Sequence, residues 1–114
     1  MAERARPPRR SANRPAETPE LRRLRRRIDA LDRRIVALLN ERAELGRAVG
    51  GAKSAAGRRA IRDAEREREV LLRVTMANAG PMPQADLLAI YRRLMAVNRR
   101  LERGDQRTEG ARST

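Results

Sequence analysis

The chain has 114 residues, a formal net charge of +13, no Cys and no His. This length supports one domain at most, and the two missing residue types exclude disulfides, thiolate chemistry, the usual general base and the commonest transition-metal ligand. Phe and Trp are absent and there is a single Tyr, so any core is built from aliphatic side chains, which favours helices over a β-sandwich.

Residues 1–19 are rich in Pro and Arg and show no hydrophobic periodicity. This composition predicts a disordered arm, for which the sequence indicates no function. No apolar run in the chain is long enough to span a membrane, and the N-terminus lacks the apolar core of a signal peptide. We therefore expect a cytoplasmic protein.

A long helix is predicted to begin at Thr18 or Pro19 and to run to about Lys53. Such a helix is about 50 Å long, which exceeds the size of the domain that the rest of the chain can form. Its apolar stripe continues beyond any surface that two shorter helices could cover, so we expect a homodimer in which the long helices pair. A plain coiled-coil dimer is the alternative. The stripe comprises Leu21, Leu24, Ile28, Leu31, Ile35, Leu38, Leu45, Val49 and Ala52.

Two shorter helices follow, over residues 63–78 and 84–102, after a loop at residues 54–60. Gly80 and Pro81 are residues typical of a helix end. The polar tail 103–114 is predicted to be flexible. The fold class is therefore all-α, with three helices in a domain spanning residues 20–102.

Each predicted helix carries a polar residue on its apolar stripe: Arg42, Glu67 and Asn98. A buried charge is costly unless it is paired, so three such interruptions predict an internal polar site between packed helices. Taken singly, each has a competing interpretation as a solvated or structural side chain. Asp63, for example, is a good helix N-cap.

Helical periodicity adds further polar residues to this site. Arg42 and Lys53 point within about 20° of each other, whereas Arg25 points about 100° away and is expected to face a neighbouring molecule. Guanidinium, ammonium, carboxylate and amide groups without a nucleophile suit the binding of a small dianion that carries hydroxyl groups, and suit acyl or phosphoryl transfer poorly. The candidates are Arg25, Arg42, Lys53, Asp63, Arg66, Glu67, Asn98 and Glu102.

Four segments in this order resemble the all-helical (type II) chorismate mutase family over residues 20–102. Together they are specific, although any single segment is a weak signal. They are Ile28-Asp29-x-Leu31-Asp32-x-x-Ile35-x-x-Leu38-Leu39-Asn40-x-Arg42, Val49-Gly50-x-x-Lys53, Arg62-Asp63-x-x-Arg66-Glu67, and Asn78-x-Gly80-Pro81 with Ile90-Tyr91-Arg92-x-Leu94, Asn98 and Glu102.

The resemblance implies an intertwined homodimer that isomerises chorismate to prephenate without a cofactor, metal or nucleophile. It implies that Arg42 and Arg66, together with Arg25 of the partner subunit, hold the two substrate carboxylates. It also implies that Lys53 contacts a carboxylate and the ether oxygen that gains negative charge as the C–O bond breaks. By this resemblance, catalysis rests on holding a compact conformer and on stabilising developing charge.

The resemblance also implies that Glu67 and Asp63 address the ring hydroxyl region. Asn98 and Glu102 stand where relatives often carry Ser and Gln. The amide of Asn98 can still donate a hydrogen bond, but a carboxylate such as Glu102 donates only when it is protonated. The sequence therefore predicts an activity that falls as pH rises through the Glu102 pKa.

Two other kinds of function remain open from the sequence. One is a sibling enzyme on the same scaffold, either a 4-amino-4-deoxychorismate mutase or an isochorismate pyruvate-lyase. The other is a basic helical nucleic-acid-binding protein, motivated by the net charge of +13. The lack of aromatic stacking residues and of a known binding motif disfavours specific nucleic-acid recognition.

Overall fold

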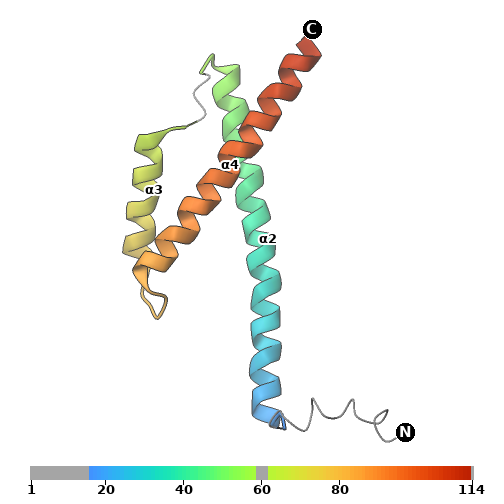
Figure 1. Ribbon diagram of the computed structural model, residues 1–114, viewed down its shortest axis with the longest axis vertical. Helices are drawn as coiled ribbons and strands as arrows, with labels where there is room; N and C mark the ends of the chain where they lie inside the picture. The colour runs from blue at the N-terminus through green and yellow to red at the C-terminus, as the bar shows by residue number, and fades with distance from the viewer. Residues whose placement is uncertain (1–15, 59–61, 114) are drawn as a thin grey trace, which may run out of the picture. The chain divides into compact units, whose positions relative to one another are not determined.

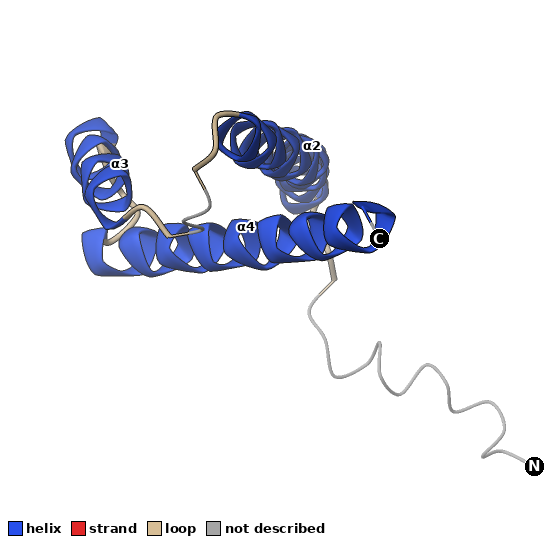
Figure 2. Cartoon of the chain, turned by 90° about the horizontal axis from the view of Figure 1, so that it is seen from above, coloured by secondary structure: helices blue, strands red, loops and turns tan. Residues whose placement is uncertain are grey.

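The computed structural model describes residues 16–58 and 62–113, so most of the predicted arm and part of the predicted loop lie outside the described residues. It contains three helices, α2 (Pro19–Ala55), α3 (Ala64–Ala77) and α4 (Gln84–Ser113) (Figure 1). No strand occurs in the described ranges (Figure 2). The prediction of an all-helical fold with one long helix and two further helices is confirmed.

The start of α2 lies at the predicted position because its first turn is capped by side chains suited to that task. The hydroxyl Oγ1 of Thr18 accepts a hydrogen bond from the backbone N–H of Leu21 at 3.1 Å, and Pro19 occupies the first helical position. The helix ends at Ala55, shortly after the predicted end, where Gly57 adopts a positive φ of 81°. Glycine adopts this left-handed conformation without steric cost.

The boundaries of α3 also follow from its caps. The carboxylate of Asp63 accepts a hydrogen bond from the backbone N–H of Arg66 at 3.0 Å, so Asp63 is the N-cap. At the other end, the amide of Asn78 donates to the Met82 carbonyl at 3.0 Å and accepts from the Gly80 N–H at 3.0 Å. These bonds shape the short turn that leads into α4, against which α3 packs.

The end of α4 differs from the prediction, which placed it at Glu102, because the helix continues to Ser113. The polar composition of this segment suggested a flexible tail. In the structure, the guanidinium of Arg47 donates to both carboxylate oxygens of Asp105, at 2.9 and 3.0 Å. A bidentate ion pair to α2 thus accompanies the continuation of α4, in a segment where the apolar stripe has ended.

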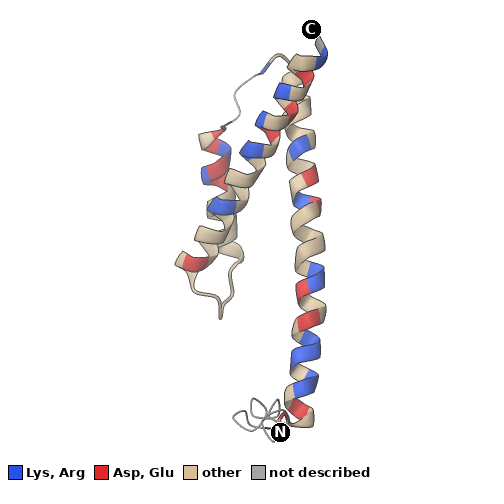
Figure 3. Ribbon diagram, turned by 45° about the vertical axis from the view of Figure 1, so that its right-hand side comes forward, with Lys and Arg blue, Asp and Glu red and all other residues tan. Residues whose placement is uncertain are grey.

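The described chain divides into two units, residues 16–38 and residues 39–113, and α2 contributes to both. In the second unit, residues 39–55 of α2 are linked to α4 by the Arg47–Asp105 ion pair and by hydrogen bonds to Asn98. Acidic and basic side chains are mixed along the helices (Figure 3). None of the helices in the described ranges is long and apolar enough to cross a membrane.

The described residues bury very little apolar surface. Met95, at 7% exposure, is their only buried hydrophobic residue, whereas the large apolar side chains of the α2 stripe are between 37% and 62% exposed. An exposed apolar stripe of this length is typical of an interaction surface, and a small chain with so small a core requires additional burial for stability.

Candidate functional site

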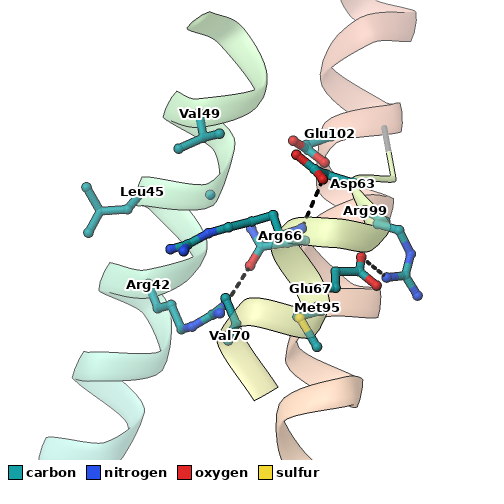
Figure 4. Close-up of a pocket in the computed structure, with 12 residues that line it drawn as sticks. Arg42, Leu45, Val49, Asp63, Arg66, Glu67, Val70, Met95, Arg99 and Glu102 are labelled. Carbon is teal, nitrogen blue, oxygen red and sulfur yellow. Dashed lines mark hydrogen bonds and ion pairs between the residues drawn. The ribbon is translucent and has the colours of Figure 1, made fainter. Parts of the chain in front are cut away.

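A cavity of about 290 Å³ lies in the second unit, where residues 39–55 of α2, α3 and α4 meet (Figure 4). Apolar side chains from all three helices form part of its wall. Its charged lining consists of three guanidinium groups and three carboxylates, those of Arg42, Arg66, Arg99, Asp63, Glu67 and Glu102. Guanidinium groups bind anions and carboxylates accept hydrogen bonds from hydroxyl groups, so the cavity offers both kinds of binding group.

Six of the eight residues predicted from the sequence line this cavity, including the three polar interruptions of the apolar stripes. Lys53 lies beside it, since its Nζ atom is 3.9 Å from Oε1 of Glu102 and its side chain is only 15% exposed. Arg25 is not among the lining residues, and it pairs with Glu17 at 2.8 Å within α2 and the residues before it. The six are Arg42, Asp63, Arg66, Glu67, Asn98 and Glu102.

Arg42 and Asn98 orient each other across the α2–α4 contact. A guanidinium N–H of Arg42 donates to Oδ1 of Asn98 at 3.3 Å, and the same guanidinium lies 5.6 Å from the centre of the Tyr91 ring. The Nδ2 group of Asn98 donates one hydrogen bond to the carbonyl of Ala43 at 3.2 Å. One N–H of the Asn98 amide therefore remains for a further acceptor.

Two glycines of α2 permit this close approach. A Cβ atom on Gly46 would lie 2.0 Å from Nδ2 of Asn98, and one on Gly50 would lie 2.7 Å from Oε1 of Glu102. Both glycines and both polar residues have the i, i+4 spacing of one helix face. Any larger side chain at these positions displaces the two polar groups of α4.

Glu102 is the most buried carboxylate of the described residues, with an exposure of 8%. Burial raises the pKa of Glu102 above its usual range, and the nearby charge of Lys53 opposes that shift. The carboxyl group is therefore protonated up to a higher pH than it is in the unfolded chain. Proton binding by Glu102 stabilises the folded state at low pH, and this contribution is lost as pH rises through the raised pKa.

Asp63 is the N-cap of α3, and Arg66 lies in the first turn of that helix. One oxygen of Asp63 serves as the helix cap, so the capping interpretation of this residue is confirmed, although Asp63 also lines the cavity. The side chain of Arg66 extends toward α2 (Figure 4), while its NH1 group donates to Glu69 at 3.2 Å. The Arg66 side chain is 55% exposed and thus accessible to an anion.

Arg99 was missed by the sequence analysis, although it lines the cavity. Its guanidinium donates to Oε2 of Glu67, whose other oxygen lies 3.4 Å from Nε of Arg62. The signal for Arg99 was its i+4 spacing from Met95 and its i−3 spacing from Glu102, which place all three on one face of α4. It was obscured by the many arginines of this helix.

The arrangement suits binding and electrostatic stabilisation. None of the residues that line the cavity carries a hydroxyl, thiol or imidazole group, so the cavity offers no usual nucleophile. Within the described residues, no group of three or more His, Cys, Asp or Glu side chains is placed to hold a metal ion. What these residues can do is fix a small anionic molecule in one conformation and stabilise charge that develops in it.

The sequence and fold match known proteins over most of the domain. Residues 24–103 match the family model described as chorismate mutase type II. A bifunctional chorismate mutase/prephenate dehydratase of Aquifex aeolicus is 40% identical over 88 residues, which cover 74% of this chain and 24% of the relative. The protein of the same name from Neisseria gonorrhoeae is 38% identical over 79 residues, covering 69% of this chain and 21% of the relative.

A solved structure supports the same relationship. Chorismate mutase (form II) from Thermus thermophilus aligns with a TM-score of 0.69 and 28% sequence identity, covering 74% of this chain and 94% of that chain. The present chain thus spans about a quarter of the length of the bifunctional relatives but nearly the whole of this solved structure. On the match over residues 24–103, the chain belongs to the chorismate mutase type II family.

Proposed function

We propose that this protein is a chorismate mutase, which converts chorismate to prephenate by a rearrangement within one bound molecule. The observation that carries the proposal is the α2–α3–α4 cavity of a type II family member, which gathers three guanidinium groups, an amide and a buried carboxyl group without a usual nucleophile. Such a rearrangement requires a fixed conformer and charge stabilisation, and these residues can supply both.

The cationic residues bind the substrate dianion in this proposal. Arg42 and Arg66 hold its carboxylates through charge-assisted hydrogen bonds, for which guanidinium groups are well suited. The free N–H of Asn98 supplies a further hydrogen bond to a carboxylate. Arg25 of the partner subunit completes this group.

Lys53 and Glu102 stabilise the negative charge that develops as the C–O bond breaks. The ether oxygen gains negative charge as its C–O bond breaks, and the ammonium of Lys53 together with protonated Glu102 donates hydrogen bonds to it. Within the same cavity, Glu67 and Asp63 accept a hydrogen bond from the ring hydroxyl. The 3.9 Å distance between Nζ of Lys53 and Oε1 of Glu102 supports a joint action on one oxygen atom.

The proposal includes an intertwined homodimer. The large apolar side chains of the α2 stripe are at least 37% exposed in a single chain, and a second copy of the same helix is the simplest surface to cover them. Each site in this dimer combines its own Arg42 with Arg25 of the partner subunit. A heterodimer of an Arg25→Ala subunit and an Arg42→Ala subunit therefore has one site with both arginines and one site with neither.

Mixing subunits tests this arrangement. Arg25→Ala and Arg42→Ala homodimers are each expected to be nearly inactive, whereas refolding an equal mixture is expected to restore about a quarter of wild-type activity. Half of the mixed population is heterodimer, and each heterodimer has one site that retains both arginines. No recovery, with light scattering showing a dimer throughout, means that Arg25 does not act in the partner's site. A monomeric wild type contradicts the dimer itself.

Product identification tests the reaction. Incubation of the purified protein with chorismate is expected to yield prephenate, an isomer of the substrate, without pyruvate. Release of pyruvate from isochorismate indicates the lyase instead. The detection of neither reaction, together with salt-dependent binding to arbitrary DNA, favours the nucleic-acid-binding alternative.

A further inference from the structure

Arg99 lies in the wall between two cavities. One is the α2–α3–α4 cavity, and the other is a second cavity of about 290 Å³ between α3 and α4. Glu67, Met95 and Arg99 line both. A ligand in the first cavity can therefore contact Glu67, while residues of the second cavity determine the electrostatic environment of this carboxylate.

Those surroundings are strongly basic. Four arginines line the second cavity, Arg62, Arg68, Arg92 and Arg99, and Glu67 is the one carboxylate among its lining residues. The guanidinium of Arg99 is bonded to Oε2 of Glu67, and Nε of Arg62 lies 3.4 Å from Oε1. Glu67 and Arg99 are only 17% and 22% exposed, so water screens this ion pair weakly.

The chemistry of this pair distinguishes a hydroxyl from an ammonium group. A hydroxyl donates one hydrogen bond to the carboxylate and accepts another from a guanidinium, so it satisfies both Glu67 and Arg99. An ammonium group only donates, and its positive charge is repelled by the guanidinium groups that already neutralise Glu67. A carboxylate without these arginines would instead favour the ammonium.

We propose that Arg99 is a specificity-determining residue, which through its ion pair with Glu67 makes the cavity select a substrate with a ring hydroxyl over the corresponding ring amine. The inference rests on the proposed chorismate mutase function and names the substrate class of that site. It separates chorismate from 4-amino-4-deoxychorismate, which Glu67 and Asp63 alone do not separate.

The test compares kcat/KM for these two substrates in the wild type and in variants of one position. The wild type is expected to prefer chorismate by at least about tenfold, and Arg99→Met is expected to reduce that ratio by about tenfold. Arg99→Lys keeps the positive charge and is expected to retain most of the preference. Arg100→Met is the matched control, because Arg100 is exposed on α4 and lines neither cavity.

A purely structural role for Arg99 lowers the activity toward both substrates equally, so an unchanged ratio in Arg99→Met overturns the inference while the mutase function stands. A wild type that prefers the amine also overturns it. If the wild type converts neither substrate, the proposed function is wrong, and the inference about Arg99 is then wrong as well. If circular dichroism shows that Arg99→Met is unfolded, the same ratio of kcat/KM values is measured for Arg99→Gln. The amide of Gln is neutral but can still donate a hydrogen bond to Glu67.

Discussion

Lys53→Ala is expected to lower kcat for chorismate by about a hundred- to a thousandfold, with a smaller change in KM. Lys53 is the single lysine of a chain with 28 basic residues, and its side chain is only 15% exposed beside Glu102. In the proposed mechanism its ammonium stabilises the charge that develops on the ether oxygen. That interaction is stronger in the transition state than in the bound substrate, so its loss affects kcat most.

The control for this prediction is Arg103→Ala, which removes an exposed positive charge of α4 outside the cavity. This variant is expected to keep the wild-type kcat, which shows that overall charge is not the cause. Steady-state kinetics of both variants, with circular dichroism as a check of folding, measure the effect. If folded Lys53→Ala retains kcat within about threefold of the wild type, the proposed role of Lys53 is wrong.

Glu102→Gln is expected to remove a pH dependence of the wild-type enzyme. Burial raises the pKa of Glu102 and keeps its carboxyl group protonated to a higher pH, and only the protonated form donates to the ether oxygen. Wild-type kcat is therefore high below this pKa and falls by about tenfold per pH unit above it, down to the residual rate of the ionised form. The amide of Gln donates at every pH, so the kcat profile of the variant is expected to be flat.

The unfolding free energy gives an independent check. Because the pKa of Glu102 is higher in the folded than in the unfolded state, the folded state binds this proton more tightly, and wild-type stability falls as pH rises between the two pKa values. Glu102→Gln is expected to lose this component in denaturant titrations at a series of pH values. Parallel kcat–pH profiles for the two proteins mean that Glu102 is not the donor.

The position of the cavity could be predicted from the sequence because polar residues on apolar stripes face inward with their neighbours. Arg42, Glu67 and Asn98 were selected on this ground, and all three line the cavity. Asp63 was recognised as an N-cap by local chemistry alone, and α3 begins immediately after it. Helical periodicity and capping are local properties, and they sufficed for these residues.

The features that the sequence did not predict depend on pairs of residues distant along the chain. The bond between Arg99 and Glu67 joins residues 32 positions apart, and the Arg47–Asp105 bond beside the extended α4 joins residues 58 apart. Because the chain has 28 basic residues, the pairing of each arginine with a particular carboxylate cannot be predicted from sequence spacing. The homodimer, the role of Arg25 and the cytoplasmic location stay predictions.

The proposed mutase function is tested by the rate at which the purified protein consumes chorismate, measured by the loss of chorismate absorbance. The product is identified and Lys53→Ala is measured in parallel. The wild type is expected to form prephenate rapidly, and the variant is expected to lose nearly all of that rate. A folded wild-type dimer that leaves chorismate unchanged would contradict the proposed function.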